Sequence, residues 1–320
     1  MPEGNVLPEP YASLARRIGR ATLKKRLIRQ ANHWAQRGHQ GSGILHLDAF
    51  LPLDAIVSAA LTVTGLAERA RANDLAPRLV ERHWRLPRLP AAFAGFRLLQ
   101  LSDLHLDLDA DFAPVLIEKM RGLVYDAVVI TGDFRNSTYE NHARAVAEAG
   151  TIIATLGEPR FGILGNHDFI EQVTELESLG LPILLNEVTK ITRGSDQLWI
   201  AGIDDSNFYC THDLARVIKA LPADACTILL SHSPEIVPEL PEDRFDLVLC
   251  GHTHGGQLCL PGGRWLHVPV RGIEKEFICG PWRLNSTQGY TSAGTGACGV
   301  PARLNCLGEM TVHVLEPMSH

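Results

Sequence analysis

The sequence lacks paired cysteines and a long apolar segment, and each absence excludes a class of protein. The seven cysteines of the 320-residue chain lie between Cys210 and Cys306, are odd in number and form no CxxC pair. This pattern argues against a disulfide framework and favours free buried thiols in a reducing compartment. The longest uncharged apolar stretch near the N-terminus, residues 55–67, is too short to cross about 30 Å of hydrocarbon. No signal-peptide pattern is present, so we expect a cytoplasmic protein.

The charge of the chain is unevenly distributed. Residues 1–40 contain eight Lys or Arg and two Glu, a local charge of +6 in a chain whose net charge is −6. The negative remainder argues against general affinity for nucleic acid. The basic segment predicts an amphipathic helix with two interpretations: peripheral contact with anionic lipid at the inner face of the membrane, or packing on its own domain.

The hydrophobic pattern changes near residue 90, after two prolines in the stretch RLPRLPAAF, which we interpret as a linker. Residues 1–90 have helical spacing of their apolar side chains. Short apolar runs follow, typical of strands buried on both faces: FRLLQLS, DAVVITG, FGILGN, LWIAGI, TILLSH, DLVLCGH and MTVHVL. Because helices are predicted between them at residues 112–123 and 139–156, the sequence indicates an α/β architecture with an at least partly parallel sheet.

Five of the predicted strands end in polar clusters. The clusters contain Asp103 and His105; Asp133; Asn166, His167 and Asp168; His232; and His252 and His254. Each cluster alone has a local explanation, such as a turn cap or a hydrogen-bonded core histidine. In open α/β sheets, however, ligands bind just beyond the carboxyl ends of the strands. Five clusters at such ends therefore predict one site.

The chemistry of these side chains predicts metal ions. Carboxylates, an amide oxygen and imidazoles, without a thiolate, suit Mn, Fe or Zn better than they suit a cysteine-rich structural zinc site. There are too many donors for one ion, which predicts two ions sharing a bridging carboxylate, about 3.5–4 Å apart. In GHTHGGQ, residues 251–257, glycines permit a turn. His252 and His254 would then serve different ions.

The motifs DLH, GD, GNHD, SHSP and GHTHGGQ, in this order, resemble the calcineurin-like metallophosphoesterase superfamily over about residues 96–315. The C-terminal stretch TQGYTSAGTGACGVPARLNCLGEMTVHVL is similar to a bacterial branch that contains membrane-associated phosphodiesterases and a UDP-2,3-diacylglucosamine pyrophosphatase of lipid A biosynthesis. The resemblance implies a four-layer αββα sandwich of two mixed sheets in residues 94–317, preceded by a helical extension, residues 1–90. Members of this branch usually begin with a transmembrane helix, and residues 1–90 do not contain one.

The resemblance also implies roles for individual residues. The first ion would be bound by Asp103, His105 and His254, the second by Asn166, His232 and His252, and both by the bridging Asp133. His167 would protonate the leaving oxygen with Asp168 orienting it, a task that suits an imidazole of near-neutral pKa. Arg135 and Asn136 follow the GD motif, and we expect them to touch the substrate phosphate, since arginine pairs bidentately with phosphate. The alternative for Arg135 is a surface position.

These features predict a metal-dependent phosphoric ester hydrolase that cleaves phosphodiester or pyrophosphate bonds through attack by metal-bound hydroxide. Within that class the alternatives are a general phosphodiesterase and a UDP-2,3-diacylglucosamine-type lipid pyrophosphatase, which the basic N-terminal segment favours weakly. A non-catalytic metal-binding scaffold is a third interpretation, but the pair His167 and Asp168 is intact. Two glycine-rich stretches, GGRW and SAGTGACG, either shape a pocket or make turns.

Overall fold

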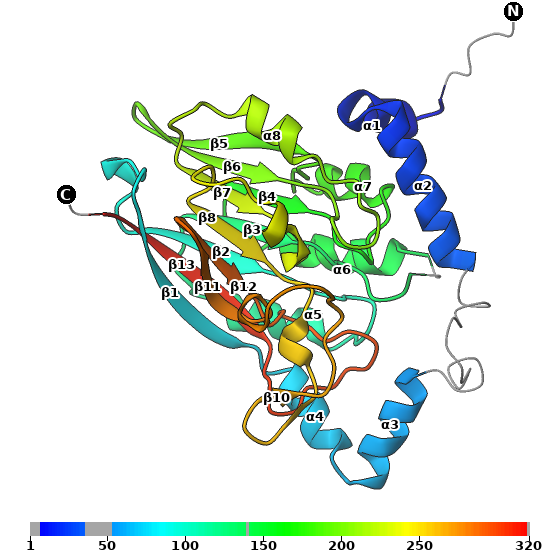
Figure 1. The fold of residues 1–320 in the computed structure, drawn as a ribbon. Coiled ribbons are helices and arrows are strands. Elements are labelled where there is room, and N and C mark those ends of the chain that lie inside the picture. The colour runs from blue at the N-terminus through cyan, green and yellow to red at the C-terminus, as the bar shows by residue number, and fades with distance from the viewer. Residues whose placement is uncertain (1–6, 36–52, 139–140, 319–320) are drawn as a thin grey trace, which may run out of the picture.

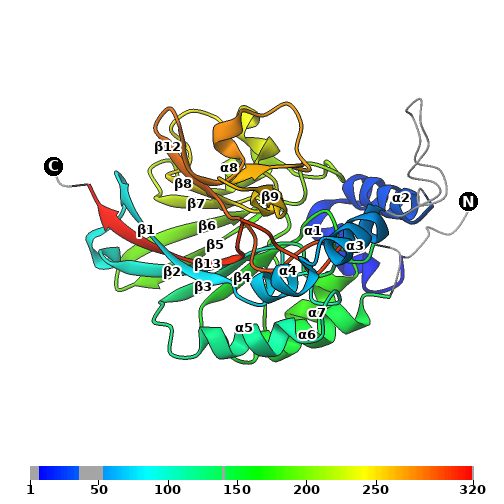
Figure 2. The same cartoon turned by 90° about the horizontal axis from the view of Figure 1, so that it is seen from below.

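The computed structural model describes residues 7–35, 53–138 and 141–318 of the chain. Two β-sheets lie face to face with helices on their outer sides (Figures 1 and 2). The α-helices are α1 (Tyr11–Ile18), α2 (Arg20–Ala35), α3 (Leu53–Val63), α4 (Ala67–Asp74), α5 (Phe112–Met120), α6 (Ala143–Ile153), α7 (Gln172–Ser178) and α8 (Leu214–Ala220). Short 3₁₀ helices lie in the loops, namely η2 (Ala91–Phe93), η3 (Pro234–Glu239), η4 (His254–Gly256) and η5 (Lys275–Phe277).

Both large sheets are mixed. The five-stranded sheet has the order β1-β13-β2-β3-β4, formed by β1 (Arg78–Leu86), β13 (Glu309–Pro317), β2 (Phe96–Leu101), β3 (Ala127–Thr131) and β4 (Arg160–Ile163). The six-stranded sheet has the order β11-β12-β8-β7-β6-β5, formed by β11 (Gly280–Leu284), β12 (Thr287–Thr291), β8 (Leu247–Cys250), β7 (Thr227–Leu230), β6 (Asp196–Gly202) and β5 (Glu187–Arg193). Within them β13–β2, β11–β12 and β5–β6 pair antiparallel. A separate two-stranded sheet joins β9 (Cys259–Leu260) to β10 (Arg264–Trp265).

The central strands are buried on both faces, which explains their continuous apolar sequences. In β2, Leu98 faces the apolar cluster between the sheets, whereas Leu99 faces the cluster beneath α5, α6 and α7. In β8, Leu249 faces the inner cluster and Val248 the cluster beneath α8. The helices therefore cover both outer faces, and the predicted αββα sandwich of two mixed sheets is confirmed.

Helices α1 and α2 pack on the sandwich through apolar and charged contacts. Leu14, Ile18 and Leu23 belong to the core cluster that α5 and α7 share. Arg17 forms ion pairs with Glu177 and Glu187, with N–O distances of 2.9 and 2.6 Å. Packing on the chain's own domain, one of the two interpretations of the basic segment, is therefore realised. The packing leaves four basic residues exposed to solvent: Arg16, Arg20, Lys24 and Lys25. Contact of these residues with lipid therefore remains a prediction.

The completely buried Arg26 connects α2 to the loops that follow β4 and β6. Its Nη1 lies 2.5 Å from Asp204 Oδ1, and its Nη2 donates to the carbonyl of Asp168 at 3.0 Å. The guanidinium also lies over the ring of Tyr209, 3.9 Å from its centroid. One turn further along α2, the side-chain oxygen of Gln30 accepts from the amide of Ile170 at 2.8 Å. Helix α2 thus braces the loop that carries the predicted catalytic histidine.

Two predictions for the first ninety residues are wrong. Residues 78–86, expected to be helical, form β1, which pairs with β13 in parallel over its whole length. Every second side chain of β1 turns inward, and Trp84 and Leu86 enter the core between the sheets. The predicted linker is part of the same core, since Leu89 and Phe93 are buried there. A domain boundary at residue 90 would separate β1 from its own sheet, because β1 is held by a strand at the far end of the chain.

The other predicted helices are largely found. The expected helix 112–123 corresponds to α5, and the expected helix 139–156 corresponds to α6, although residues 139–140 lie outside the described part of the chain. Residues 1–6 and 36–52 of the predicted extension also lie outside it. None of the helices within the described ranges is both long enough and apolar enough to span a bilayer.

We expect Arg26→Met to destabilise the protein by about 3–5 kcal/mol, because it leaves the Asp204 carboxylate buried without its cation. Arg16→Met is the matched control: Arg16 pairs with Glu9 at the surface, where both side chains are mostly exposed, and its loss should cost less than about 1 kcal/mol. Chemical denaturation of both variants measures the difference. Equal stability of the two variants would contradict a structural role for the α2 contact.

Candidate metal centre

The predicted ligands converge where strands of both sheets end. Asp103 and His105 follow β2, Asp133 follows β3, Asn166 follows β4, His232 follows β7, and His252 and His254 follow β8. Donor atoms of three residue groups lie within 4.8 Å of one another: Asp133, His232 and His252; His105, Asp133 and His167; and His105, His254 and Cys298. Asp133 joins two of these groups, which is the position expected of a bridging carboxylate.

The backbone at these strand ends turns sharply. Five of the seven predicted ligands have a positive φ: Asp103 (54°), His105 (44°), Asp133 (56°), His252 (71°) and His254 (51°). Residues with a side chain rarely adopt this left-handed conformation, which costs of order 1 kcal/mol or more each. In an extended chain alternate side chains point to opposite faces, so these turns are what direct the imidazoles and carboxylates into one centre.

The loops approach one another so closely that glycine is required at two of the strand ends. A Cβ at Gly251, just before His252, would overlap the side chain of Ser102, and a Cβ at Gly165 would overlap the carboxylate of Asp133. The glycines of the GN and GH motifs are therefore needed because the backbone there lies so close to the ligand loops.

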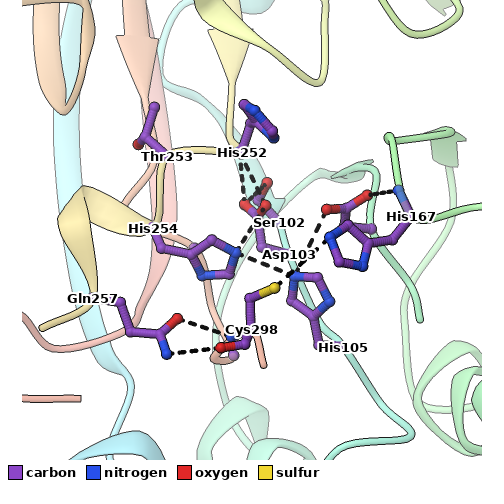
Figure 3. A network of polar contacts seen from close by, with 12 residues as sticks. Ser102, Asp103, His105, His167, His252, Thr253, His254, Gln257 and Cys298 are labelled. Carbon is purple, nitrogen blue, oxygen red and sulfur yellow. Dashed lines mark hydrogen bonds and ion pairs between the residues drawn. The ribbon is translucent and has the colours of Figure 1, made fainter. Parts of the chain in front are cut away.

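One half of the centre contains Asp103, His105 and His254 (Figure 3). His254 Nε2 lies 3.1 Å from His105 Nε2 and 3.5 Å from Asp103 Oδ1. His105 Nε2 lies 3.7 Å from Asp133 Oδ2. Two ligand atoms bound to one ion at about 2.0–2.1 Å stand roughly 3 Å apart. The spacing of these donors therefore fits a shared divalent ion.

The other half contains Asn166, His232 and His252, again beside Asp133. His232 Nε2 lies 2.9 Å from Asn166 Oδ1 and 3.2 Å from Asp133 Oδ2. The ring centroids of His232 and His252 are 5.1 Å apart. Asn207, on the loop after β6, reaches His252 Nε2 with its amide nitrogen at 2.7 Å, a contact that the sequence analysis missed. The two histidines of GHTHGGQ therefore lie in different halves, and their binding of different ions remains a prediction.

Backbone carbonyls hold several of the imidazoles in one orientation. The Nδ1 of His105 donates to the carbonyl of Arg135 at 2.9 Å, and that of His232 donates to the carbonyl of Thr131 at 2.8 Å. Such bonds direct Nε2 toward the centre, as is usual for metal-binding histidines. His254 is an exception, because its Nδ1 faces the guanidinium of Arg303 at 3.2 Å. The donor types, their spacing and their orientation together fit a pair of divalent ions.

The pKa values divide the imidazoles into two classes. Burial lowers the pKa of His105 and of His252 to about 3, and burial with the neighbouring His105 ring holds the pKa of His254 well below its usual range. These three rings are neutral, the form that binds metal. For His232, burial would lower the pKa, but the carboxylate of Asp133 outweighs it and raises the pKa to about 10. A proton must therefore leave His232 when an ion binds.

Asp168 does not orient His167, contrary to the sequence prediction. The Nδ1 of His167 donates instead to the carbonyl of Asn136 at 2.6 Å. The buried carboxylate of Asp168 accepts from four backbone amides, those of Asp133 (2.8 Å), Phe134 (2.9 Å), Arg135 (3.4 Å) and Gly165 (2.9 Å). A carboxylate next to a histidine in sequence cannot fold back onto that ring here, because the turn aims it at the backbone. Asp168 thus ties the loops after β3 and β4 together.

The two predicted substrate contacts lie on the loop after β3. Arg135 is fully buried, and its guanidinium lies over the ring of Phe169, 4.3 Å from the centroid. The surface position that was the alternative for Arg135 is therefore wrong. Asn136 is bound to the loop that contains Gly299, because its Oδ1 accepts a hydrogen bond from the Gly299 amide at 2.8 Å. Their contact with a substrate phosphate remains a prediction.

Cys298 is a second residue at the centre, besides Asn207, that the sequence analysis did not select. Its Sγ lies 3.7 Å from His167 Nε2 and joins His105 and His254 in one group of potential ligands. The only sequence signal is its place in SAGTGACG, and no local spacing links it to the other motifs. The stretch SAGTGACG therefore reaches the site instead of only making turns.

The chain matches the family model "Calcineurin-like phosphoesterase" over residues 96–256. A zebrafish (Danio rerio) protein named "Transmembrane protein with metallophosphoesterase domain" is 30% identical over 82% of this chain and 61% of its own length. "Phosphodiesterase YaeI" of Escherichia coli is 29% identical over 68% of this chain and 82% of its own length. A solved NAD nucleotidase of Haemophilus influenzae is similar with a TM-score of 0.43 and 19% identity over 63% of this chain and 46% of that chain. The chain thus spans about three fifths of the length of the transmembrane relatives.

We expect the zinc affinity of the chelator-stripped protein to rise by about tenfold per pH unit between about pH 6 and 9. The raised pKa of His232 means that a proton occupies the ring throughout this window and competes less as the pH increases. Calorimetric titration in buffers of different ionisation enthalpy counts the released proton. His232→Ala should lose this pH dependence. A wild-type affinity independent of pH would contradict the assignment.

Proposed function

The chain belongs to the calcineurin-like phosphoesterase family, and we propose that it hydrolyses phosphodiester or pyrophosphate bonds with two divalent metal ions. The resemblance predicted from the five motifs is thereby confirmed at the level of the family. The family and the relative named phosphodiesterase support a metal-dependent phosphoester hydrolase. The observation that carries the proposal is Asp133, whose carboxylate lies within 4.8 Å of ring nitrogens in two histidine groups, His105 with His167 and His232 with His252.

The residues of the centre suit two ions of Mn, Fe or Zn. One ion would be held by Asp103, His105 and His254, the other by Asn166, His232 and His252, and both by Asp133. Bound ions at such a centre lower the pKa of a coordinated water toward neutrality and neutralise charge on phosphoryl oxygens. The protein's part is to keep the donors converged, which the left-handed turns and the Asp168 carboxylate accomplish.

His167 is placed to supply a proton. The residue is partly exposed, and one of its ring nitrogens belongs to one group of neighbouring donor atoms with His105 and Asp133. Burial would lower the pKa of His167, but the Asp133 carboxylate raises it well above its ordinary value. With Nδ1 bound to the Asn136 carbonyl, the proton available for a leaving oxygen is the one on Nε2.

Two features support a lipid-borne substrate, such as the lipid pyrophosphate of a UDP-2,3-diacylglucosamine type. Helix α2 leaves Ile28 50% exposed, one turn after the exposed Lys24 and Lys25. Helix α3 exposes Ile56 and Val63, and its Asp54 borders Gly299, the residue after Cys298. A basic surface and an apolar helix therefore flank the candidate centre, an arrangement that suits the anionic inner face of a membrane. A general phosphodiesterase is the simpler alternative.

A non-catalytic scaffold is the remaining rival. It predicts metal binding without turnover, whereas hydrolysis of bis-p-nitrophenyl phosphate by manganese-loaded protein supports an enzyme. The intact set of donors and the position of His167 favour the enzyme.

We expect His167→Ala to reduce the turnover of a phosphodiester with a poor alkoxide leaving group by about 10² to 10⁴ while the bound metal is retained. The loss should be smaller for bis-p-nitrophenyl phosphate, because nitrophenolate leaves without a proton. His83→Ala, an exposed histidine on β1, is the control and should keep full activity. If His167→Ala hydrolysed both substrates as fast as the wild type does, His167 would not be the acid.

We expect the protein to sediment with vesicles that contain anionic phosphatidylglycerol. Changing Arg20 and Lys24 to Glu should weaken this binding at least about tenfold, since each basic residue near an anionic surface contributes about 1 kcal/mol. Lys119→Glu with Arg121→Glu makes the same charge change on the exposed end of α5 and should leave binding unchanged. Equal sedimentation of both double variants would remove the argument for a lipid substrate.

A further inference from the structure

We propose that Cys298 is a ligand of the ion held by Asp103, His105 and His254, so that this half of the centre combines nitrogen, oxygen and sulfur donors. The inference rests on the proposed two-ion centre and adds a ligand that the family motifs do not include. It follows from three observations: the place of the sulfur among the imidazoles, the anchoring of its backbone, and the close packing of its loop.

The sulfur of Cys298 lies among buried metal-binding side chains. Its Sγ, a nitrogen of His105 and a nitrogen of His254 all lie within 4.8 Å of one another. The residues His105 and His254 are only 1% and 6% exposed. Figure 3 shows the Cys298 side chain directed toward the space between these rings. A donor there would complete the coordination of an ion that the two imidazoles and the carboxylate hold from the other sides.

The backbone of Cys298 is anchored by Gln257, the last residue of GHTHGGQ. The Oε1 of Gln257 accepts from the Cys298 amide at 2.8 Å, and its Nε2 donates to the Cys298 carbonyl at 2.9 Å (Figure 3). The next amide, that of Gly299, donates to Asn136 Oδ1. One side chain from the histidine loop thus fixes the cysteine relative to His254, which gives the final residue of the motif a role.

Close packing and a hydrogen bond place the cysteine loop against the loop of Asp103 and His105. A Cβ at Gly296 would lie 2.6 Å from the carbonyl oxygen of Leu104, between the two ligands Asp103 and His105. The guanidinium of Arg303 donates to the carbonyl of Gly296 and also faces His254. The glycines of SAGTGACG therefore bring Cys298 to the ligands.

Ligation would exchange a proton for a metal bond. As the Sγ–metal bond forms, the thiol loses its proton to solvent, and no electron is transferred. Thiolate is a soft donor that favours Zn and Fe over the harder Mn and Mg. We therefore expect the half of the centre that contains Cys298 to prefer zinc, whereas the half with Asn166 and His232 has only oxygen and nitrogen donors.

Cobalt(II) substitution tests the sulfur bond without reference to activity. The stripped full-length protein, loaded with two equivalents of Co²⁺, should develop a near-ultraviolet sulfur-to-cobalt charge-transfer band in addition to visible d–d bands. Cys298→Ser should lose the charge-transfer band and keep the d–d bands. Cys306→Ser is the matched control, because the Cys306 Sγ contacts the His254 carbonyl outside the ligand group, and it should keep both.

The preference for zinc gives a second measurement. The ratio of the zinc to the manganese affinity, measured by chelator competition, should fall at least about tenfold in Cys298→Ser, since a soft ligand is lost. Cys306→Ser should leave the ratio unchanged.

Alkylation of the wild-type protein keeps the test independent of any variant's folding. Iodoacetamide should label Cys298 in the stripped protein and fail to label it after zinc is added. Cobalt-loaded wild type that hydrolyses bis-p-nitrophenyl phosphate without a sulfur band, or zinc-loaded protein in which Cys298 is still alkylated, would overturn the ligand and leave the proposed function standing. Failure to bind two ions at all would overturn both.

Discussion

The carboxylate of Asp133 is the constraint on which the rest of the site depends. It is buried, it lies within 3.2 Å of the His232 imidazole and 3.7 Å of that of His105, and it also accepts from the backbone of His167 at 2.9 Å. Burial would raise its pKa, but His232 and His167 hold the pKa well below the usual range. A buried anion of this kind needs nearby positive charge, and two divalent cations would supply it from both halves of the centre.

The fold brings the other donors to this carboxylate at a local energetic cost. The parallel strands of both sheets end at one edge, and left-handed residues turn the chain there instead of letting it continue outward. The turns are stabilised by contacts behind the ligands: Asp168 binds the backbone of two loops, carbonyls hold the imidazoles, and Arg26 of α2 braces the β4 loop. The N-terminal helices are thus part of the support of the site, because α2 contacts the loop of His167 through Arg26 and Gln30.

The sequence predicted the parts of this arrangement that depend on local patterns. Runs such as DLVLCGH combine a strand with its ligands, so both the sheet edge and the convergence of Asp133 with the histidines could be inferred. Strand β1 was missed because the charged residues between Val80, Trp84 and Leu86 obscure its alternation, and because its partner lies at the other end of the chain. The Arg26–Asp204 pair spans 178 positions and the contact of Cys298 with His167 spans 131. Such contacts, like the true direction of the Asp168 carboxylate, arise only from tertiary packing.

Anomalous diffraction from crystals grown with manganese or zinc tests the central claim most directly. The account predicts two anomalous peaks about 3.5–4 Å apart, with the carboxylate of Asp133 touching both, His105 and His254 on one side, and His232 and His252 on the other. A single peak, or two peaks of which Asp133 touches neither, would contradict it.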